Sequence, residues 1–540
     1  MALPPPLQTL RGPWAALPGT VLVALLAAGP AASQQHAMPA TEFVLNGVIP
    51  LFETLGPYGR AVTTANAEAQ AYFNQGLRLA FAFGMHDAQQ SFVAAAKKDP
   101  TCASCRWGLA WALGPYVNGP SDPGGEEIAY LQAQEAKRLA AGATPVERAL
   151  IDALAVRYAA APGAEGRAPL DRAYVAAMRD VHTRFPDDVD VATLYAESIM
   201  VQRQRDFWTR SGQPQPGVDE ALAVLEDVLR RAPTHPGACH LYIHLTEGSP
   251  APARGERCAD ALVGAMPGAS HMQHMPSHTY VRTGRYAEAV RVNQLARAAD
   301  AQAERGGVSA IYPDHNLHML LVAASYDGQS AVAIQAARDL AQLSPTSAHQ
   351  LPLVLVRFGR WQEILALPAP SDRFQAAMLA YARGLATLRT GRATDGPALL
   401  GAVDGALEPE TDRDRRLLLG LASAVLGAEI DAATGRYDAA VAALAQARAV
   451  EASMPYMEPE EWVVPVRQVL GDILLKAGRP AEAETAYRGD LEAHPENGWS
   501  LYGLSRSLDA QGKAADAAAT LGRFRRAWAR ADIQLSGSRF

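Results

Sequence analysis

The sequence has few charged side chains and no excess of basic ones. Charged residues make up 19% of the 540 residues, and 56 Asp and Glu outnumber 49 Lys and Arg, which gives a formal net charge of −7. A protein that binds nucleic acid usually presents a stripe of Lys and Arg to the phosphates. The charge balance therefore argues against a nucleic-acid partner.

The motifs of several common active sites are also missing. The sequence has no phosphate-binding Walker loop, no Rossmann glycine fingerprint after a strand, no nucleophile elbow and no HExxH zinc motif. No histidine follows Cys105 in the CxxC of residues 102–105, which excludes attachment of a c-type haem there. Any chemistry must come from another group of residues.

The N-terminus has the features of an export signal. Arg11 is its only charge, the apolar stretch Trp14–Gly29 follows, and the small residues Ala31, Ala32 and Ser33 suit cleavage by a signal peptidase. A membrane anchor is the alternative, but this stretch is shorter than the ~20 residues that a bilayer needs. We therefore interpret residues 1–33 as a signal peptide, and we expect an exported protein, periplasmic or secreted, without a membrane span after cleavage.

Glycine and proline recur between apolar stretches of about a dozen residues, which is typical of short helices joined by turns. Near the C-terminus, small residues, an aromatic residue and a proline follow the spacing of a 34-residue helix–turn–helix unit. The residues are Gly471, Gly478, Ala483, Tyr487 and Pro495, and a second copy has Gly76, Ala88, Phe92, Ala95 and Pro100. The pattern resembles the tetratricopeptide repeat (TPR). This resemblance implies an all-α fold, a TPR-like array of helix–turn–helix repeats that forms a curved superhelix.

The repeats and the turn-rich segments between them suggest a division of the chain. We expect a signal peptide at 1–33, a lead-in at 34–65, a TPR-like array with a histidine-lined concave groove at 66–350, irregular helical repeats at 351–430 and C-terminal TPR repeats at 431–540. Five segments rich in Gly, Pro or polar residues are expected to be loops. They are Gly119–Gly125, Ala161–Ala168, Arg210–Gly217, Arg305–Pro313 and Pro368–Asp372.

Two short motifs resemble signatures of a group of exported bacterial TPR proteins. They are CASCRWG at 102–108, with the pattern CxxCxWG, and HMPSHTYVRTGRY at 274–286, with the pattern HMPSHxYxRxGRY. TPR arrays serve many partners, so the resemblance is informative about fold and poor for function. It implies a protein or peptide ligand in the concave groove.

Seven of the thirteen histidines lie between residues 240 and 318. They are His240, His244, His271, His274, His278, His315 and His318. In the register set by Pro267, Gly284 and Gly328, each of them falls on position 2, 5 or 9 of a repeat. At ~100° per residue these positions share one helix face. In TPR proteins this face lines the concave ligand surface, so the resemblance implies a groove lined by imidazoles.

The same register places Glu197 on position 9 of the preceding unit, beside His244 and His278. Imidazoles one turn apart can bind one metal ion, and neighbouring helices can complete its shell. A ligand set dominated by histidine suits Cu, Zn, Fe or Ni better than Ca or Mg, which prefer oxygen. There are more candidate ligands than one metal ion can bind. Some of these residues would therefore orient the ligands, face a substrate or bind a second ion.

Three functions stay open from the residues. The histidine face indicates an exported binding or scaffold protein with a metal site in its groove. A metal-dependent enzyme, hydrolytic or oxidative, could use the same cluster if the ion kept an open coordination position. A metal-free groove could instead bind an acidic or aromatic peptide.

Four cysteines in an exported chain favour disulfide formation. Cys239 and Cys258 fall on positions 4 and 23 of one repeat, where its two helices touch, so we predict a disulfide between them, with free buried thiols as the alternative. Cys102 and Cys105 lie in no βαβ pattern and have no second pair at zinc-finger spacing. For them a structural or regulatory disulfide is expected.

Overall fold

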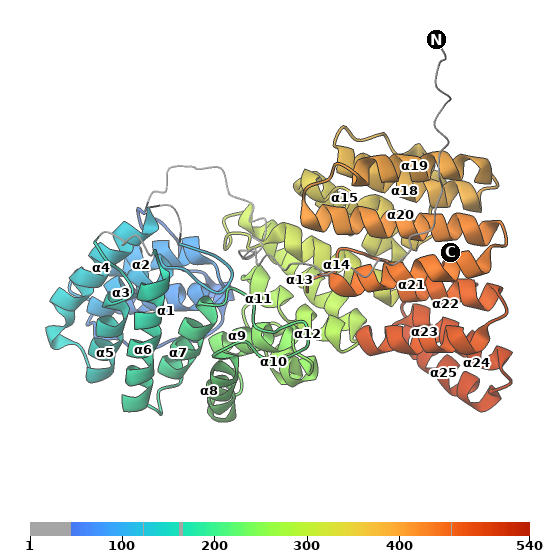
Figure 1. The fold of residues 1–540 in the computed structure, drawn as a ribbon. Coiled ribbons are helices and arrows are strands. Elements are labelled where there is room, and N and C mark those ends of the chain that lie inside the picture. The colour runs from blue at the N-terminus through green and yellow to red at the C-terminus, as the bar shows by residue number, and fades with distance from the viewer. Residues whose placement is uncertain (1–44, 122–123, 161–165, 455) are drawn as a thin grey trace, which may run out of the picture. The chain divides into compact units, whose positions relative to one another are not determined.

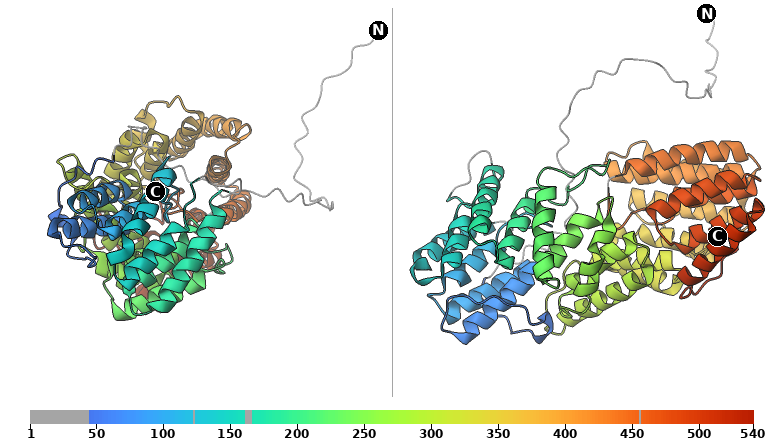
Figure 2. Two further views of the ribbon diagram at one scale, coloured as in Figure 1. Left: turned by 90° about the vertical axis from the view of Figure 1, so that its left-hand side faces the viewer. Right: turned by 90° about the horizontal axis from the view of Figure 1, so that it is seen from below.

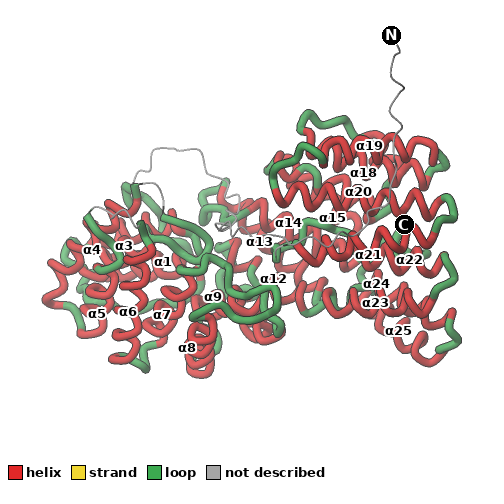
Figure 3. The backbone as a smooth tube through the Cα atoms, in the orientation of Figure 1, coloured by secondary structure: helices red, strands yellow, loops and turns green. Residues whose placement is uncertain are grey.

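A computed structural model describes residues 45–121, 124–160, 166–454 and 456–540 (Figure 1). The predicted signal peptide lies outside these residues. The described chain is helical, and it contains no β-strand, only the isolated bridges Tyr116–Gly119 and Trp208–Pro214 (Figure 3). The prediction of an all-α fold with TPR-like helix–turn–helix repeats is confirmed.

Most helices pack against the next helix along the chain, and views at right angles show them side by side in chain order (Figure 2). After the short turn η1 (Glu53–Leu55) come α1 (Ala67–Phe81), α2 (Met85–Lys98), α3 (Ala103–Ala112), α4 (Gly125–Leu139), α5 (Pro145–Ala155), α6 (Ala168–Arg184), α7 (Val189–Val201), α8 (Val218–Arg231), α9 (Pro236–Glu247) and α10 (Glu256–Leu262). The next helices are α11 (Ser270–His274), α12 (Pro276–Arg282), α13 (Tyr286–Ala303), α14 (Pro313–Asp327), α15 (Ser330–Leu343), α16 (Gln350–Arg357) and α17 (Trp361–Ala366). The last are α18 (Arg373–Arg389), α19 (Gly396–Leu407), α20 (Arg413–Ala433), α21 (Tyr437–Ser453), α22 (Val466–Lys476), α23 (Pro480–Ala493), α24 (Gly498–Ala510) and α25 (Ala514–Ala527).

One aromatic ring sits between two glycines in each of the clearest repeats. A Cβ added to Gly76 of α1 or to Gly108 of α3 would lie 2.8 or 2.4 Å from the ring of Phe92 in α2. In the C-terminal repeats, the Tyr487 ring of α23 occupies the same place between Gly471 and Gly503, at 2.4 and 2.3 Å. A glycine is therefore required on either side of the ring, because any side chain there would overlap it. This contact fixes the spacing of three consecutive helices.

Local signals explain where the helices begin and turn. The Asn66 side chain accepts hydrogen bonds from the backbone N–H groups of Glu68 and Ala69 and so caps α1. Thr144 and Glu147 form a reciprocal capping box at the start of α5. Gly284 takes φ = 78° in the turn before α13, a conformation that favours glycine. The chain therefore turns back on itself after each first helix where the repeat pattern predicts it.

The described parts of the expected loops fall between consecutive helices, while residues 122–123 and 161–165 lie outside the described residues. Sequence analysis missed one long connection, between Ser453 at the end of α21 and Val466 at the start of α22. Residues 45–540 group into a single compact unit, and the divisions near 350 and 430 stay predictions. Among the described residues, no helix combines the length and the apolar character that crossing a membrane requires.

The glycine–aromatic contact predicts opposite effects for two alanine substitutions. Gly471→Ala places a methyl group against Tyr487 and should lower the free energy of unfolding by ~1–3 kcal/mol. Gly420→Ala, in α20, meets no atom within 4 Å and should raise it by up to ~1 kcal/mol, because alanine favours helix. Denaturant unfolding of both variants measures the difference, and equal effects would contradict the packing described here.

Candidate metal centre

Six of the seven candidate histidines converge, and four helices supply them. His240 and His244 lie one turn apart on α9, and His271, His274 and His278 lie along α11 and α12. His315 reaches them from the first turn of α14. Contacts between neighbouring imidazole rings link all six, with centroid distances from 4.6 to 6.1 Å. We call these six residues the histidine cluster.

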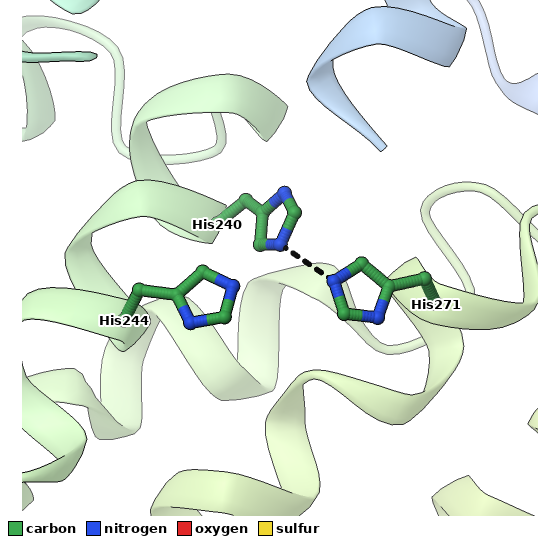
Figure 4. A group of neighbouring side chains, drawn as sticks. All are labelled: His240, His244 and His271. Carbon is green, nitrogen blue, oxygen red and sulfur yellow. Dashed lines mark hydrogen bonds between the residues drawn. The ribbon is translucent and has the colours of Figure 1, made fainter. Parts of the chain in front are cut away.

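The cluster contains two groups of three. In the first group, His240, His244 and His271 turn one ring nitrogen each toward the others (Figure 4). The potential ligand atoms lie within 4.8 Å of one another, and Nε2 of His240 is 3.1 Å from Nε2 of His271. Nε2 of His244 is buried and has no hydrogen-bond partner among the described residues. Such nitrogens are suited to bind one ion together.

The second group consists of His274, His278 and His315, again with potential ligand atoms within 4.8 Å of one another. Nε2 of His278 lies 2.7 Å from Nε2 of His274 and 3.4 Å from Nε2 of His315. Three imidazole nitrogens therefore meet around a second point.

Two carboxylates lie on the opposite, Nδ1 side of the rings. Oε1 of Glu247 is 3.0 Å from Nδ1 of His244, and its Oε2 forms an ion pair with Nδ1 of His278. Oε2 of Glu458 is 2.9 Å from the same Nδ1 of His278, and its other oxygen pairs with Arg205. His244, Glu247 and Glu458 form a third set of atoms close enough to hold an ion.

Oxygen acceptors at Nδ1 determine which nitrogen of the ring is free. Nδ1 of His240 lies 2.6 Å from the carbonyl oxygen of Phe81, which can only accept a hydrogen bond. Nδ1 of His274 lies 2.7 Å from Oδ1 of Asn293, whose Nδ2 donates to the carbonyl oxygen of Ala289 at 2.8 Å. Both rings therefore carry the proton on Nδ1 and present the Nε2 lone pair to the cluster. Metal-binding histidines are commonly held in this way.

The cluster is buried, although its residues were predicted to line a concave groove. His240, His244, His271, His274 and His278 each expose 2% or less of their surface, and only His315 and His318 are half-buried. The ring of Phe83, in the turn between α1 and α2, packs on His240, His244 and His271 at centroid distances of 4.2, 5.6 and 5.6 Å. The repeat face that was predicted to line a concave groove is therefore covered by Phe83 at the first group.

Burial has an electrostatic consequence. Removal from water, together with the positive charge of neighbouring histidines, holds the pKa values of His240, His271 and His274 well below the ordinary value. Burial alone would raise the pKa of Glu247, but His278 and His244 outweigh it and hold that pKa below its ordinary value. The neutral forms of these three imidazoles and the ionised form of the Glu247 carboxylate are therefore favoured.

Two predicted ligands lie apart from the cluster. Oε2 of Glu197 accepts a hydrogen bond from Nε1 of Trp111 at 3.0 Å, and burial raises the pKa of Glu197 to about 7 although Arg157 opposes the shift. Glu197 belongs to none of the three sets of neighbouring ligand atoms among the described residues. His318 belongs to none of them either, and burial lowers its pKa although the charge of Glu461 opposes the shift. The structure does not bring these two residues to the metal-ligand groups.

Glu247 and Glu458 are the carboxylates that lie beside the histidines, where the sequence predicted Glu197. Glu247 follows His244 by three residues on the same helix, so the spacing HxxE was a signal that could have identified it. Glu458 comes from the long connection between α21 and α22. No repeat register could have placed Glu458 next to His278.

One of the two predicted disulfides is present. Cys102 and Cys105 form the expected disulfide, with a Cα–Cα distance of 5.3 Å. Cys239 and Cys258 are free buried thiols, so the disulfide predicted between them is not formed. They do lie in contact, as their repeat positions require, and a hydrogen bond between the thiols raises the pKa of Cys258. Cys239 in turn donates to the carbonyl oxygen of Pro233 at 3.6 Å, so hydrogen bonds satisfy both thiols.

Comparisons with known proteins add little beyond the fold. A scan against protein-family models finds no match, and a search of curated proteins finds none. Solved structures with similar helix arrangements include human IFIT1 bound to m7Gppp-AAAA (11% identity, 80% of this chain and 90% of that chain, TM-score 0.31) and the P58(IPK) TPR domain (11% identity, 83% and 99%, TM-score 0.23). The APC/C hetero-tetramer Cut9–Hcn1 is similar at 13% identity, 85% and 90% coverage and a TM-score of 0.30. Likeness at this level carries no argument about function.

Buried neutral imidazoles should make the metal-free protein less stable in acid. In the unfolded chain histidine takes up a proton near pH ~6.5, whereas in the folded protein the pKa values of His240, His271 and His274 are lower. The unfolded state therefore binds more protons below pH ~6.5, and the free energy of unfolding should fall by up to ~1.4 kcal/mol per pH unit for each group. Above pH ~7.5 these groups are neutral in both states and contribute no slope.

Denaturant unfolding of the metal-free protein between pH 5 and 8 measures this slope. His240→Gln removes one buried imidazole. The slope of the free energy of unfolding against pH should then decrease by the contribution of one histidine. An unchanged slope in that variant would contradict the assignment.

Proposed function

We propose that this protein is an exported TPR-like binding protein that holds a transition-metal ion in the histidine cluster. One observation carries the proposal: the Nε2 atoms of His274 and His278 lie 2.7 Å apart while the Nδ1 atom of each faces oxygen acceptors. Two neutral rings in this arrangement would direct lone pairs at each other. A cation bound by both nitrogens turns this repulsion into attraction.

A proton on His278 is the simplest competing explanation, since Glu247 and Glu458 would stabilise an imidazolium there. That proton leaves the first group unexplained, because Nε2 of His244 remains buried without a partner among the described residues. Burial of an unpaired polar atom costs roughly 1–3 kcal/mol. Metal binding can account for both groups, whereas one proton accounts for one.

The donor set points to a class of metal. Imidazole nitrogens suit Zn, Cu, Fe and Ni, whereas Ca and Mg prefer shells of oxygen. The carboxylates face the Nδ1 side of the rings and would orient the histidines. We therefore propose Zn, Cu, Fe or Ni as the bound ion.

A metal-dependent enzyme is the second candidate, and the number of ligands in each group favours it. Three imidazoles leave a coordination position of a tetrahedral ion open for water or substrate. The metal-free peptide groove is weaker, since five of the seven histidines expose 2% or less of their surface. A protein or peptide partner would then bind an exposed face of the repeats.

Two features support export. His274 and His278 belong to the HMPSHxYxRxGRY pattern that resembles exported bacterial TPR proteins. The disulfide between Cys102 and Cys105 suits an oxidising compartment, where such bonds persist. We propose a periplasmic or secreted location for the mature chain.

Metal binding should stabilise the protein and depend on the second group. A ligand bound only by the folded state adds ~2.7 kcal/mol at a hundredfold excess over its dissociation constant, so Zn²⁺ should raise the melting temperature of the chelator-treated protein. His274→Asn combined with His278→Asn should reduce that rise by about half or more, measured by differential scanning calorimetry.

His318→Asn is the matched control, because His318 comes from the same repeat face and lies outside the three ligand sets. It should keep the full rise in melting temperature. If the wild-type protein contains no stoichiometric metal after purification without chelator, and gains no stability from Zn, Cu, Ni or Fe, the proposed metal function is wrong.

The proposed export signal has a direct test. If residues 1–33 are removed, the protein recovered from outside the cytoplasm should begin at Gln34. N-terminal sequencing or intact-mass measurement of that protein identifies the first residue. A chain that retains Trp14–Gly29 would instead support a membrane anchor.

A further inference from the structure

We infer that the cluster holds two metal ions, one on each three-histidine group, and that Glu247 couples them from outside both shells. This inference rests on the proposed metal function and goes beyond it in stoichiometry and in the role of Glu247. The first ion would bind His240, His244 and His271, and the second ion would bind His274, His278 and His315.

The repeat itself builds the site twice. In each group, two histidines lie four residues apart at positions 5 and 9 of one repeat, on α9 in the first group and across α11 and α12 in the second. The third lies at position 2 of the next repeat. His240 and His244 correspond to His274 and His278, and His271 corresponds to His315. Two equal sets of ligands at equivalent positions indicate two equal sites.

The series stops after the second group for a reason visible in the sequence. His318 occupies position 5 of the third repeat, but position 9 of that repeat is Val322, which offers no ligand atom. This difference explains why His318 lies outside the cluster although it shares the repeat face. If all six histidines formed one site, the pattern of positions 5 and 9 of one repeat with position 2 of the next would not need to occur twice.

Glu247 contacts both groups through the histidine at position 9 of each. Its Oε1 faces Nδ1 of His244 at 3.0 Å, and its Oε2 faces Nδ1 of His278, so each oxygen orients the position-9 histidine of one group. The position-5 histidines have separate acceptors, the carbonyl oxygen of Phe81 for His240 and Oδ1 of Asn293 for His274. Glu247 is therefore a positioning residue shared by both sites.

The ligand class follows from the donors. Each site offers three imidazole Nε2 atoms, which suit a late first-row divalent ion and leave at least one coordination position open. The single negative charge of Glu247 is shared between two ligands, so removing it should weaken both sites. Loss of such an outer partner typically costs 10–100-fold in metal affinity.

Metal stoichiometry of the full mature chain tests the inference. Titration of the metal-free protein with Co²⁺, followed by its visible absorption, should end at two equivalents, and elemental analysis after loading with Zn²⁺ should give two ions per chain. His271→Asn should leave one ion, on the second group, and His315→Asn should leave one ion, on the first group. His318→Asn should still bind two.

Glu247→Gln should keep two ions with each affinity lowered ~10–100-fold, and with the same Co²⁺ absorption band, since Glu247 is not itself a ligand. Loss of one ion or a changed band would show that Glu247 binds metal directly and would overturn its assigned role. Far-UV circular dichroism and thermal unfolding of each metal-free variant establish that it is folded before titration.

The outcomes separate this inference from the function on which it rests. One ion per wild-type chain, lost in both His271→Asn and His315→Asn, would overturn the two-ion assignment and leave a single metal site. No bound ion in the wild-type protein would remove the metal function itself.

Discussion

Close packing of an aromatic ring between two glycines sets the distance and register of neighbouring helices in the clearest repeats. Phe92 lies between Gly76 and Gly108, and Tyr487 lies between Gly471 and Gly503, in pairs 32 residues apart. A ring held on both sides permits little sliding of one helix past the next. Equivalent positions of successive repeats can then present their side chains to a common point, which a metal site needs because ligands must be held within fractions of an ångström.

Charge and burial act against each other in the histidine cluster. Imidazoles in water are easily protonated, and removal from water favours the neutral form that binds metal. Phe83 covers the first group and so shields its ring nitrogens from water. Glu458 lies beside Nδ1 of His278 and presents a carboxylate oxygen to it. Nδ1 donors with oxygen acceptors complete the arrangement at His240 and His274. Neutral rings with fixed tautomers are better prepared to bind a cation than solvated ones.

The sequence predicted the fold and the convergence of most of the histidines because both follow the repeat. The register from Gly284 and Pro267 placed the histidines on positions 2, 5 and 9, and the structure brings six of the seven together. The predictions were wrong for residues whose partners are determined by contacts between distant parts of the chain. Glu197 shares the repeat face, but its carboxylate bonds to Trp111. Cys239 and Cys258 meet as their positions predict, although contact alone does not determine whether two thiols are oxidised.

The segment around Glu458 links the histidine cluster to a part of the chain that is distant in sequence. Glu458 reaches His278 and Arg205 from the connection between α21 and α22, while Glu461 of the same segment lies 3.4 Å from His349 and accepts a hydrogen bond from Gln350 at 2.6 Å. Repeat arrays usually transmit stability only between neighbours. Here carboxylates from near residue 460 face side chains more than 100 residues earlier in the chain. A cation in the cluster would draw Glu458 inward electrostatically, so metal binding would strengthen contacts that the repeat pattern alone does not provide.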